Sequence, residues 1–163
     1  MHQIIFALCA AALLGLGAPA QAADIEIIQP WVRVNPGSGT GALYFTLHNA
    51  GADSDRLVAA TTPMARRADL HASMAERNIV RMEKLNGIEV SAGGSVPFQP
   101  GGLHVMLTGL DAAAKPGRSL PVTLRFERAG ERTIAAPILA PGAEPPSAMG
   151  PAGMQGTVGH GRH

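Results

Sequence analysis

Residues 101–110, GGLHVMLTGL, alternate in polarity in a way that predicts a half-buried β-strand. Three aliphatic side chains fall on one face of this strand, and His104 and Met106 fall on the other. The solvent face of a strand more often carries hydroxyl or charged side chains, so an imidazole and a thioether two residues apart are unusual there. The alternation indicates the class of fold, and the two outer residues indicate where function should be sought.

Short alternating segments of the same kind continue along the chain. Clusters of Gly, Pro, Asn and Asp separate them at roughly ten-residue spacing, which is typical of an antiparallel sandwich or barrel. No long amphipathic helix and no internal repeat are evident, so the sequence predicts a single all-β domain. The expected strands are 24–28, 31–34, 41–49, 56–61, 67–73, 79–85, 103–107, 122–127 and 132–138, the last two joined by a hairpin turn at Ala129-Gly130.

The two ends of the chain differ from this middle part. The apolar run 4–16 is too short to cross a bilayer, which takes about 20 residues, and the small-residue triplet Ala20-Gln21-Ala22 follows it. Residues 1–22 are therefore expected to be a cleaved secretory signal peptide, which leaves a mature chain with no membrane-spanning segment. Residues 23–140 are the expected domain, and residues 141–163 are expected to form a flexible Pro/Gly-rich tail with scattered Met and His.

Composition argues against several classes of function. The net charge is +1 and the basic residues are scattered, which speaks against nucleic-acid binding. Cys9, the only cysteine, lies in the expected signal peptide, so the mature chain would hold no disulfide and no thiolate ligand. No catalytic triad, phosphate-binding loop or HExxH motif is present, and no enzyme activity is predicted. Arg33, Arg56 and the pair Arg66-Arg67 are interpreted as solvated faces or partner contacts rather than as catalysts.

A second pair of His and Met falls on the segments 67–73 and 79–85. A hairpin turn between Glu76 and Arg77 would place His71 directly opposite Met82, with Cβ atoms about 5 Å apart on one face. A slip of one residue would move one of them to the other face. If this pair and the pair His104 and Met106 meet at one end of the sandwich, two ring nitrogens and two sulfurs surround one point.

The type of ligand indicates the metal. Zn²⁺ prefers thiolate, imidazole and carboxylate, and Ca²⁺ and Mg²⁺ prefer oxygen, whereas Cu(I) is soft and suits thioether and imidazole. A thioether also survives in an oxidising compartment, where paired thiols form disulfides. We therefore expect a Cu(I) site made by His71, Met82, His104 and Met106. Because ligation requires neutral imidazole, Cu(I) affinity should fall as the pH drops through the ordinary histidine range, about 6.5.

The spacing of these four residues, H-x10-M-x21-H-x-M, resembles the signature of the PCuAC-type periplasmic copper chaperone family. Segments 42–49, 55–58, 92–94 and 100–104 are also similar to family segments, and the resemblance covers roughly residues 25–138. It implies a cupredoxin-like Greek-key β-sandwich in the Gram-negative periplasm, with one Cu(I) held by the four residues. It further implies delivery of copper to the CuA centre of a haem-copper oxidase, the acceptor being the oxidase CuA subunit, a Sco-type thiol protein, or both.

Some family members carry a C-terminal extension that contains His and Met, and the tail here is similar but sparse. Its Met149, Met154, His160 and His163 would either bind additional copper weakly or serve only solubility. The main alternative function is copper buffering or tolerance without a dedicated client. An electron-transfer cupredoxin is disfavoured because its site needs a Cys thiolate. A metal-free adhesive or assembly sandwich remains open.

Overall fold

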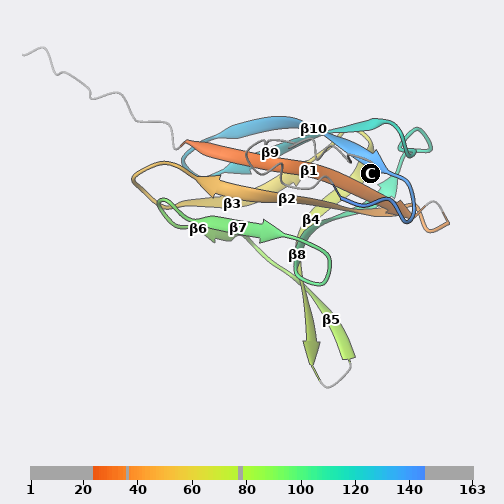
Figure 1. Ribbon diagram of the computed structural model, residues 1–163, viewed down its shortest axis with the longest axis horizontal. Helices are drawn as coiled ribbons and strands as arrows, with labels where there is room; N and C mark the ends of the chain where they lie inside the picture. The colour runs from red at the N-terminus through yellow and green to blue at the C-terminus, as the bar shows by residue number, and fades with distance from the viewer. Residues whose placement is uncertain (1–23, 36, 77–78, 146–163) are drawn as a thin grey trace, which may run out of the picture.

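The computed structural model describes residues 24–35, 37–76 and 79–145, and this part of the chain consists of strands and their connections (Figure 1). It contains ten strands and no helix. The strands are β1 (Ile25–Asn35), β2 (Thr40–Asn49), β3 (Asp55–Thr61), β4 (Ala65–Glu76), β5 (Ile79–Lys84), β6 (Ile88–Val90), β7 (Ser95–Phe98), β8 (Leu103–Leu110), β9 (Ser119–Phe126) and β10 (Glu131–Leu139). The expected signal peptide, residues 1–22, lies outside the described residues, as does the tail beyond residue 145.

Hydrogen bonding joins the strands in the order β5-β4-β8-β7-β2-β1-β10-β9-β3-β6, and β8 also pairs with β2. Most neighbours are antiparallel, and β1 and β10 run parallel, with Val32 paired to Ile138. This parallel pair links one half of the sheet, β5 to β1, to the other half, β10 to β6. The predicted all-β, cupredoxin-like Greek-key sandwich is thus confirmed at the level of fold class.

The core forms because both halves of the sheet turn an aliphatic face inward. Leu43 and Val105 from one half, and Val122 and Leu124 from the other, have no exposed surface and belong to a single hydrophobic cluster. Burying a side chain of this size contributes about 1.5–3 kcal/mol relative to leaving it exposed. The strict alternation of buried and half-exposed residues along β2 is the alternation that the sequence predicts.

The strands differ from the prediction in two main respects. The two segments expected at 24–28 and 31–34 are one strand, β1, whose pairing with β2 shifts between Ile28 and Trp31. A bulge at this point, where Gln29 has a φ of 50°, lets the strand continue past Pro30. The strands β6 and β7 were not predicted, because three or four residues are too few to establish an alternation.

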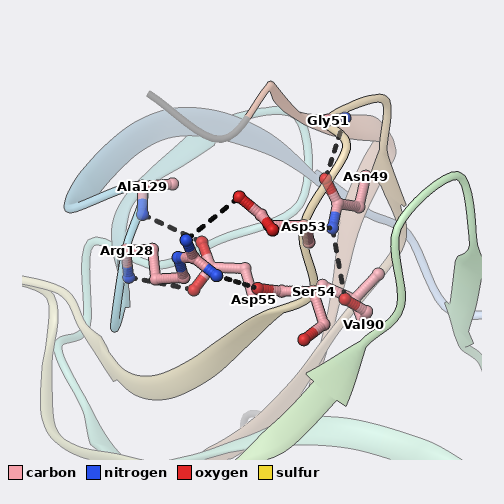
Figure 2. Close-up of polar contacts among 8 residues, drawn as sticks. All are labelled: Asn49, Gly51, Asp53, Ser54, Asp55, Val90, Arg128 and Ala129. Atoms are coloured by element: carbon pink, nitrogen blue, oxygen red, sulfur yellow. Dashed lines mark hydrogen bonds and ion pairs between the residues drawn. The ribbon is translucent and has the colours of Figure 1, made fainter. Parts of the chain in front are cut away.

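A buried carboxylate organises the loop next to the β9–β10 turn (Figure 2). Asp55 is 3% exposed, and its side chain accepts hydrogen bonds from the backbone N–H groups of Arg56, Arg128 and Ala129 at 2.7–2.9 Å. Such charge-assisted bonds offset the cost of burying the carboxylate. Asn49, which is fully buried, is likewise bonded to surrounding backbone groups (Figure 2). No candidate metal ligand takes part in this network, so its role is structural.

Candidate metal centre

The register of β4 with its two neighbours brings the candidate ligands onto one face. On one side of β4, His71 is paired with His104 of β8. On the other side, Ser73 is paired with Met82 of β5. Directly paired residues project to the same face, and so do residues two apart on one strand. His71, Met82, His104 and Met106 therefore all project from the outer face of this half of the sheet.

The predicted pairing of His71 with Met82 is wrong. Lys84 lies opposite His71, and Met82 lies one pair further along, opposite Ser73. The strands pair as far as Glu76 and Ile79, so the turn falls one residue later in the chain than predicted. Moving the turn by one residue changes each pairing by two, so Met82 stays on the face of His71.

An aromatic row crosses the outer face through the two imidazoles. The rings of His71 and His104 lie 5.8 Å apart between centroids, at 64° to one another. The ring of Tyr44 on β2 follows at 6.3 Å from His104, and that of Trp31 on β1 lies 4.5 Å beyond it. Neither Tyr44 nor Trp31 was predicted to lie near the ligands, because alternation shows which face a residue takes but not which strands are neighbours.

A second row runs parallel to the first. Met106 of β8 is paired with Asp69 of β4 on one side and with Ala42 of β2 on the other, and Ala42 is paired with Arg33 of β1. Asp69 is bonded to Lys84 at 2.6 Å and to Arg67 at 2.9 Å. The hydrogen bond from Lys84, together with the charges of both cations, holds the pKa of Asp69 below its ordinary value. Both oxygens of this carboxylate are therefore engaged in ion pairs, one with Lys84 and one with Arg67.

The imidazole of His104 is fixed in orientation. It is 4% exposed, and its Nδ1 lies 3.1 Å from the carbonyl oxygen of Gly102. Because a carbonyl only accepts hydrogen bonds, Nδ1 must carry the proton, which leaves the lone pair on Nε2. Metal-binding histidines commonly have their second nitrogen bonded in this way.

The surroundings of His71 favour the neutral form of its imidazole. Burial lowers its pKa, and repulsion from a protonated His104 lowers it further, against the opposing effect of Asp69. Its Nδ1 is buried and has no hydrogen-bond partner among the described residues. A buried nitrogen without a partner is uncommon and calls for an explanation. A bound metal ion would supply that missing interaction, which fits His71 as a ligand.

The two sulfurs differ in exposure. Met106 is half-buried, whereas Met82 is 61% exposed on the β4–β5 hairpin, which projects from the body of the molecule (Figure 1). Between this hairpin and the sheet lies a cleft of about 610 Å³, here called the hairpin cleft. It is lined by Arg33, Val34, Asn35, Thr40, Gly41, Ala42, Tyr44, Ser73, Val80, Met82, Gly101, His104, Met106 and Pro141. Three of the four candidate ligands thus border one open space.

Within the residues that the structure describes, no three His, Cys, Asp or Glu side chains gather as a metal-ion cluster. A metal centre on this face would therefore depend on the thioethers. Met149, Met154, His160 and His163 lie outside the described residues, so their interpretation as weak additional ligands stays a prediction. Across the described ranges, no helix is long and apolar enough to cross a membrane.

Similarity to known proteins identifies the family. The family model described as "Putative lipoprotein LpqE-like" matches residues 25–138. The chain belongs to this family, which is the PCuAC family. This PCuAC-family chain is 31% identical over 119 residues to "Putative lipoprotein Lxx21020" of Leifsonia xyli subsp. xyli (strain CTCB07), covering 72% of the chain and 71% of that protein. The family resemblance inferred from the spacing of His and Met is confirmed.

Solved structures of similar sequence share the fold. The copper-bound PCuAC domain from PmoF2 is 29% identical, with a TM-score of 0.63, and the match covers 74% of this chain and 96% of that domain. The solution structure of apo-DR1885 from Deinococcus radiodurans is 27% identical, with a TM-score of 0.55, over 85% of this chain and 94% of that protein. The solution structure of CuI-DR1885 is 26% identical, with a TM-score of 0.54, over 77% and 81%. This PCuAC-family chain therefore resembles proteins that have been determined with copper bound.

Proposed function

We propose that this protein is a periplasmic copper chaperone that binds one Cu(I) through His71, Met82, His104 and Met106. The observation that carries the proposal is the register that places all four side chains on one face, with His71 directly opposite His104. Membership of the PCuAC family and the similarity to copper-bound relatives support it. Two imidazoles and two thioethers form a soft ligand set of the kind that Cu(I) prefers.

The different exposure of the ligands suits transfer rather than storage. His104 is buried and fixed, so it would hold the ion in place. Met82 is mostly exposed and lies on the projecting hairpin, so its sulfur could be displaced first by a ligand from an acceptor. The ion would then pass by stepwise exchange of ligands, with no covalent bond made or broken in the protein. The acceptor would be the CuA subunit of a haem-copper oxidase, a Sco-type thiol protein, or both.

The ligand assignment can be tested by competition with a Cu(I) chelator under anaerobic conditions. We expect Met82→Leu and Met106→Leu each to weaken Cu(I) binding about tenfold or more, which corresponds to about 1.4 kcal/mol, because Leu retains the bulk but removes the sulfur. Met74→Leu is the matched control, since Met74 is 50% exposed on the same hairpin but projects from its other face. Wild-type affinity in both ligand variants would reject the site.

Delivery and buffering predict different phenotypes. If the protein delivers copper, a deletion strain should lose oxidase activity when copper is scarce, and added copper should restore it. If the protein only buffers copper, the deletion strain should be sensitive to excess copper and keep its oxidase activity under scarcity. The second result would reject the delivery part of the proposal and leave the metal site standing.

A further inference from the structure

The hairpin cleft is much larger than a metal ion requires. Its volume of about 610 Å³ compares with about 30 Å³ for one water molecule in the liquid. Its walls are mainly apolar, and Val80 and Met82 on the hairpin side are 66% and 61% exposed. Such a space beside the candidate ligands has room for part of another molecule, and exposed apolar side chains of this kind favour contact with a partner.

One charged residue, Arg33, lines this cleft, and no acidic side chain among the described residues does. The guanidinium of Arg33 lies over the ring of Trp31 at 5.1 Å, and its Nη2 donates to the carbonyl oxygen of Ala143 at 3.0 Å. These two contacts fix the position of the side chain. They do not neutralise its charge, and within the described residues no carboxylate forms an ion pair with it.

The hydrogen-bonding capacity of Arg33 is also underused. A guanidinium has five N–H donors, whose fork geometry matches a carboxylate. The Nε of Arg33 is buried and has no hydrogen-bond partner in the described part of the chain. Tyr44, which also lines the cleft, offers a hydroxyl that stays protonated, because burial raises its pKa more than the charge of Arg33 lowers it. The cleft wall therefore presents the fixed cation of Arg33 and the neutral donor of Tyr44, and no acidic side chain among the described residues lines the cleft beside them.

The register places this cation near the candidate copper ligands. Ala42 lies between Met106 and Arg33 in the same row, so Arg33 is two strand spacings, or roughly 10 Å, from Met106. An extended peptide rises about 3.3 Å per residue, so about three residues span this distance. One short segment could thus bring a copper-binding side chain to Met106 and a carboxylate to Arg33 together.

We propose that the hairpin cleft is the docking site for an extended, mainly apolar segment of the copper acceptor protein, and that Arg33 binds an Asp or Glu carboxylate of that segment. The identity of the partner as a copper acceptor rests on the proposed function, whereas the carboxylate site rests on the cleft itself. Arg33 positions the partner and is not a copper ligand.

The test uses two uncharged-end probe peptides and the full chain without copper. The peptides are acetyl-Val-Ala-Asp-Ala-Val-amide and the same peptide with Asn in place of Asp, and binding is followed by NMR shifts of backbone amides. We expect the Asp peptide to bind about five- to tenfold more tightly, with shifts at Gly41 and Ala42, and we expect added salt to reduce the difference. Equal binding of the two peptides would overturn the proposal.

Variants then assign the preference to one residue. Arg33→Gln should bind both peptides equally, and Arg33→Lys should retain only part of the preference, because it keeps the charge without the planar fork. Arg125→Gln is the matched control, since Arg125 is an exposed cation on β9, and it should keep the full preference. A preference that persists in Arg33→Gln would contradict the assignment. If Arg33→Gln does not fold, a full wild-type preference in Arg33→Lys would contradict it instead.

Two further measurements separate the alternatives. If sodium acetate binds as tightly as the Asp peptide, the cleft is a small-anion site and its assignment to a polypeptide is wrong. The Cu(I) affinity of Arg33→Gln should equal that of the wild type. Retention of copper affinity by Met82→Leu and Met106→Leu would reject the proposed function, whereas loss of the Asp preference would reject only the docking site, so the two failures are distinguishable.

Discussion

At the scale of single residues, the two candidate imidazoles are prepared for ligation in different ways. The carbonyl oxygen of Gly102 fixes the proton of His104 on Nδ1 and so directs its Nε2 lone pair. No hydrogen bond holds the Nδ1 of His71 in a comparable way within the described residues, but burial and the nearby His104 lower its pKa and so favour the neutral ring. The spacing of His and Met in the sequence indicates which residues could bind a metal, but it contains no information about these supporting contacts.

The lowered pKa of His71 predicts how proton competition depends on pH. The groups that face this imidazole are His104, Asp69, Lys84 and Arg67, and their combined effect with burial lowers the pKa below the ordinary value of about 6.5. Protons should therefore compete with copper for His71 only below that pH, so this imidazole should add almost nothing to the pH dependence of Cu(I) affinity between pH 8 and 7. Without copper, the His71 ring is protonated at a higher pH in the unfolded chain than in the folded one. The contribution of His71 therefore lowers the free energy of unfolding as the pH falls through the ordinary histidine pKa of about 6.5.

NMR titration of the His71 ring in the copper-free protein measures this shift. We expect a midpoint below about 6.5, and a higher midpoint in His104→Gln, because that substitution removes a charge that repels the protonated ring. A midpoint above the ordinary histidine value would contradict the electrostatic description of the site.

At the scale of elements, alternation in the sequence predicted the faces and the β9–β10 hairpin correctly, but it predicted the wrong partner for His71 on β5. It placed His104 and Met106 outward on β8, as the structure does. It could not show that His104 lies opposite His71, because that pairing is a contact between strands 33 residues apart in the chain. It also misplaced the β4–β5 turn by one residue, since the choice between two adjacent turns depends on small differences in turn preference.

The register of the β4–β5 hairpin can be tested by cross-linking on the face away from the candidate ligands. With Cys9→Ser as background, Ala72→Cys with Glu83→Cys should form a disulfide, because these residues are directly paired and their Cα atoms should lie about 4.5–5.5 Å apart. Ala72→Cys with Arg81→Cys corresponds to the register first predicted, and as a diagonal pair at about 7–8 Å it should not. Mass spectrometry under mild oxidation gives the yields, and a better yield for the second pair would contradict the observed register.

At the scale of the whole molecule, the sandwich and the candidate site depend on different residues. The fold is stabilised by one aliphatic cluster to which both halves of the sheet contribute, and none of the four candidate ligands belongs to it. The sequence predicted the class of fold because aliphatic alternation recurs in most strands. It did not predict the hairpin cleft, since that space is formed by β1, β2, β8 and the hairpin together.

This separation predicts that copper stabilises a damaged core as much as an intact one. Leu124 is fully buried on β9, and Leu124→Ala should cost about 2–5 kcal/mol of unfolding free energy. Met106→Leu conserves volume and should cost less than about 1.5 kcal/mol.

Cu(I) at a free concentration of 100 times the Kd should add about 2.7 kcal/mol to the unfolding free energy of any variant with an intact site, by mass action. In anaerobic urea unfolding, the unfolding free energy of the wild type and of Leu124→Ala should rise by this amount, because both keep all four ligands. That of Met106→Leu at the same copper concentration should rise clearly less. A folded Leu124→Ala protein that copper fails to stabilise would mean that the packing of the far half of the sheet sets the ligand geometry, and the four residues could then not be treated as a site supported by their own strands alone.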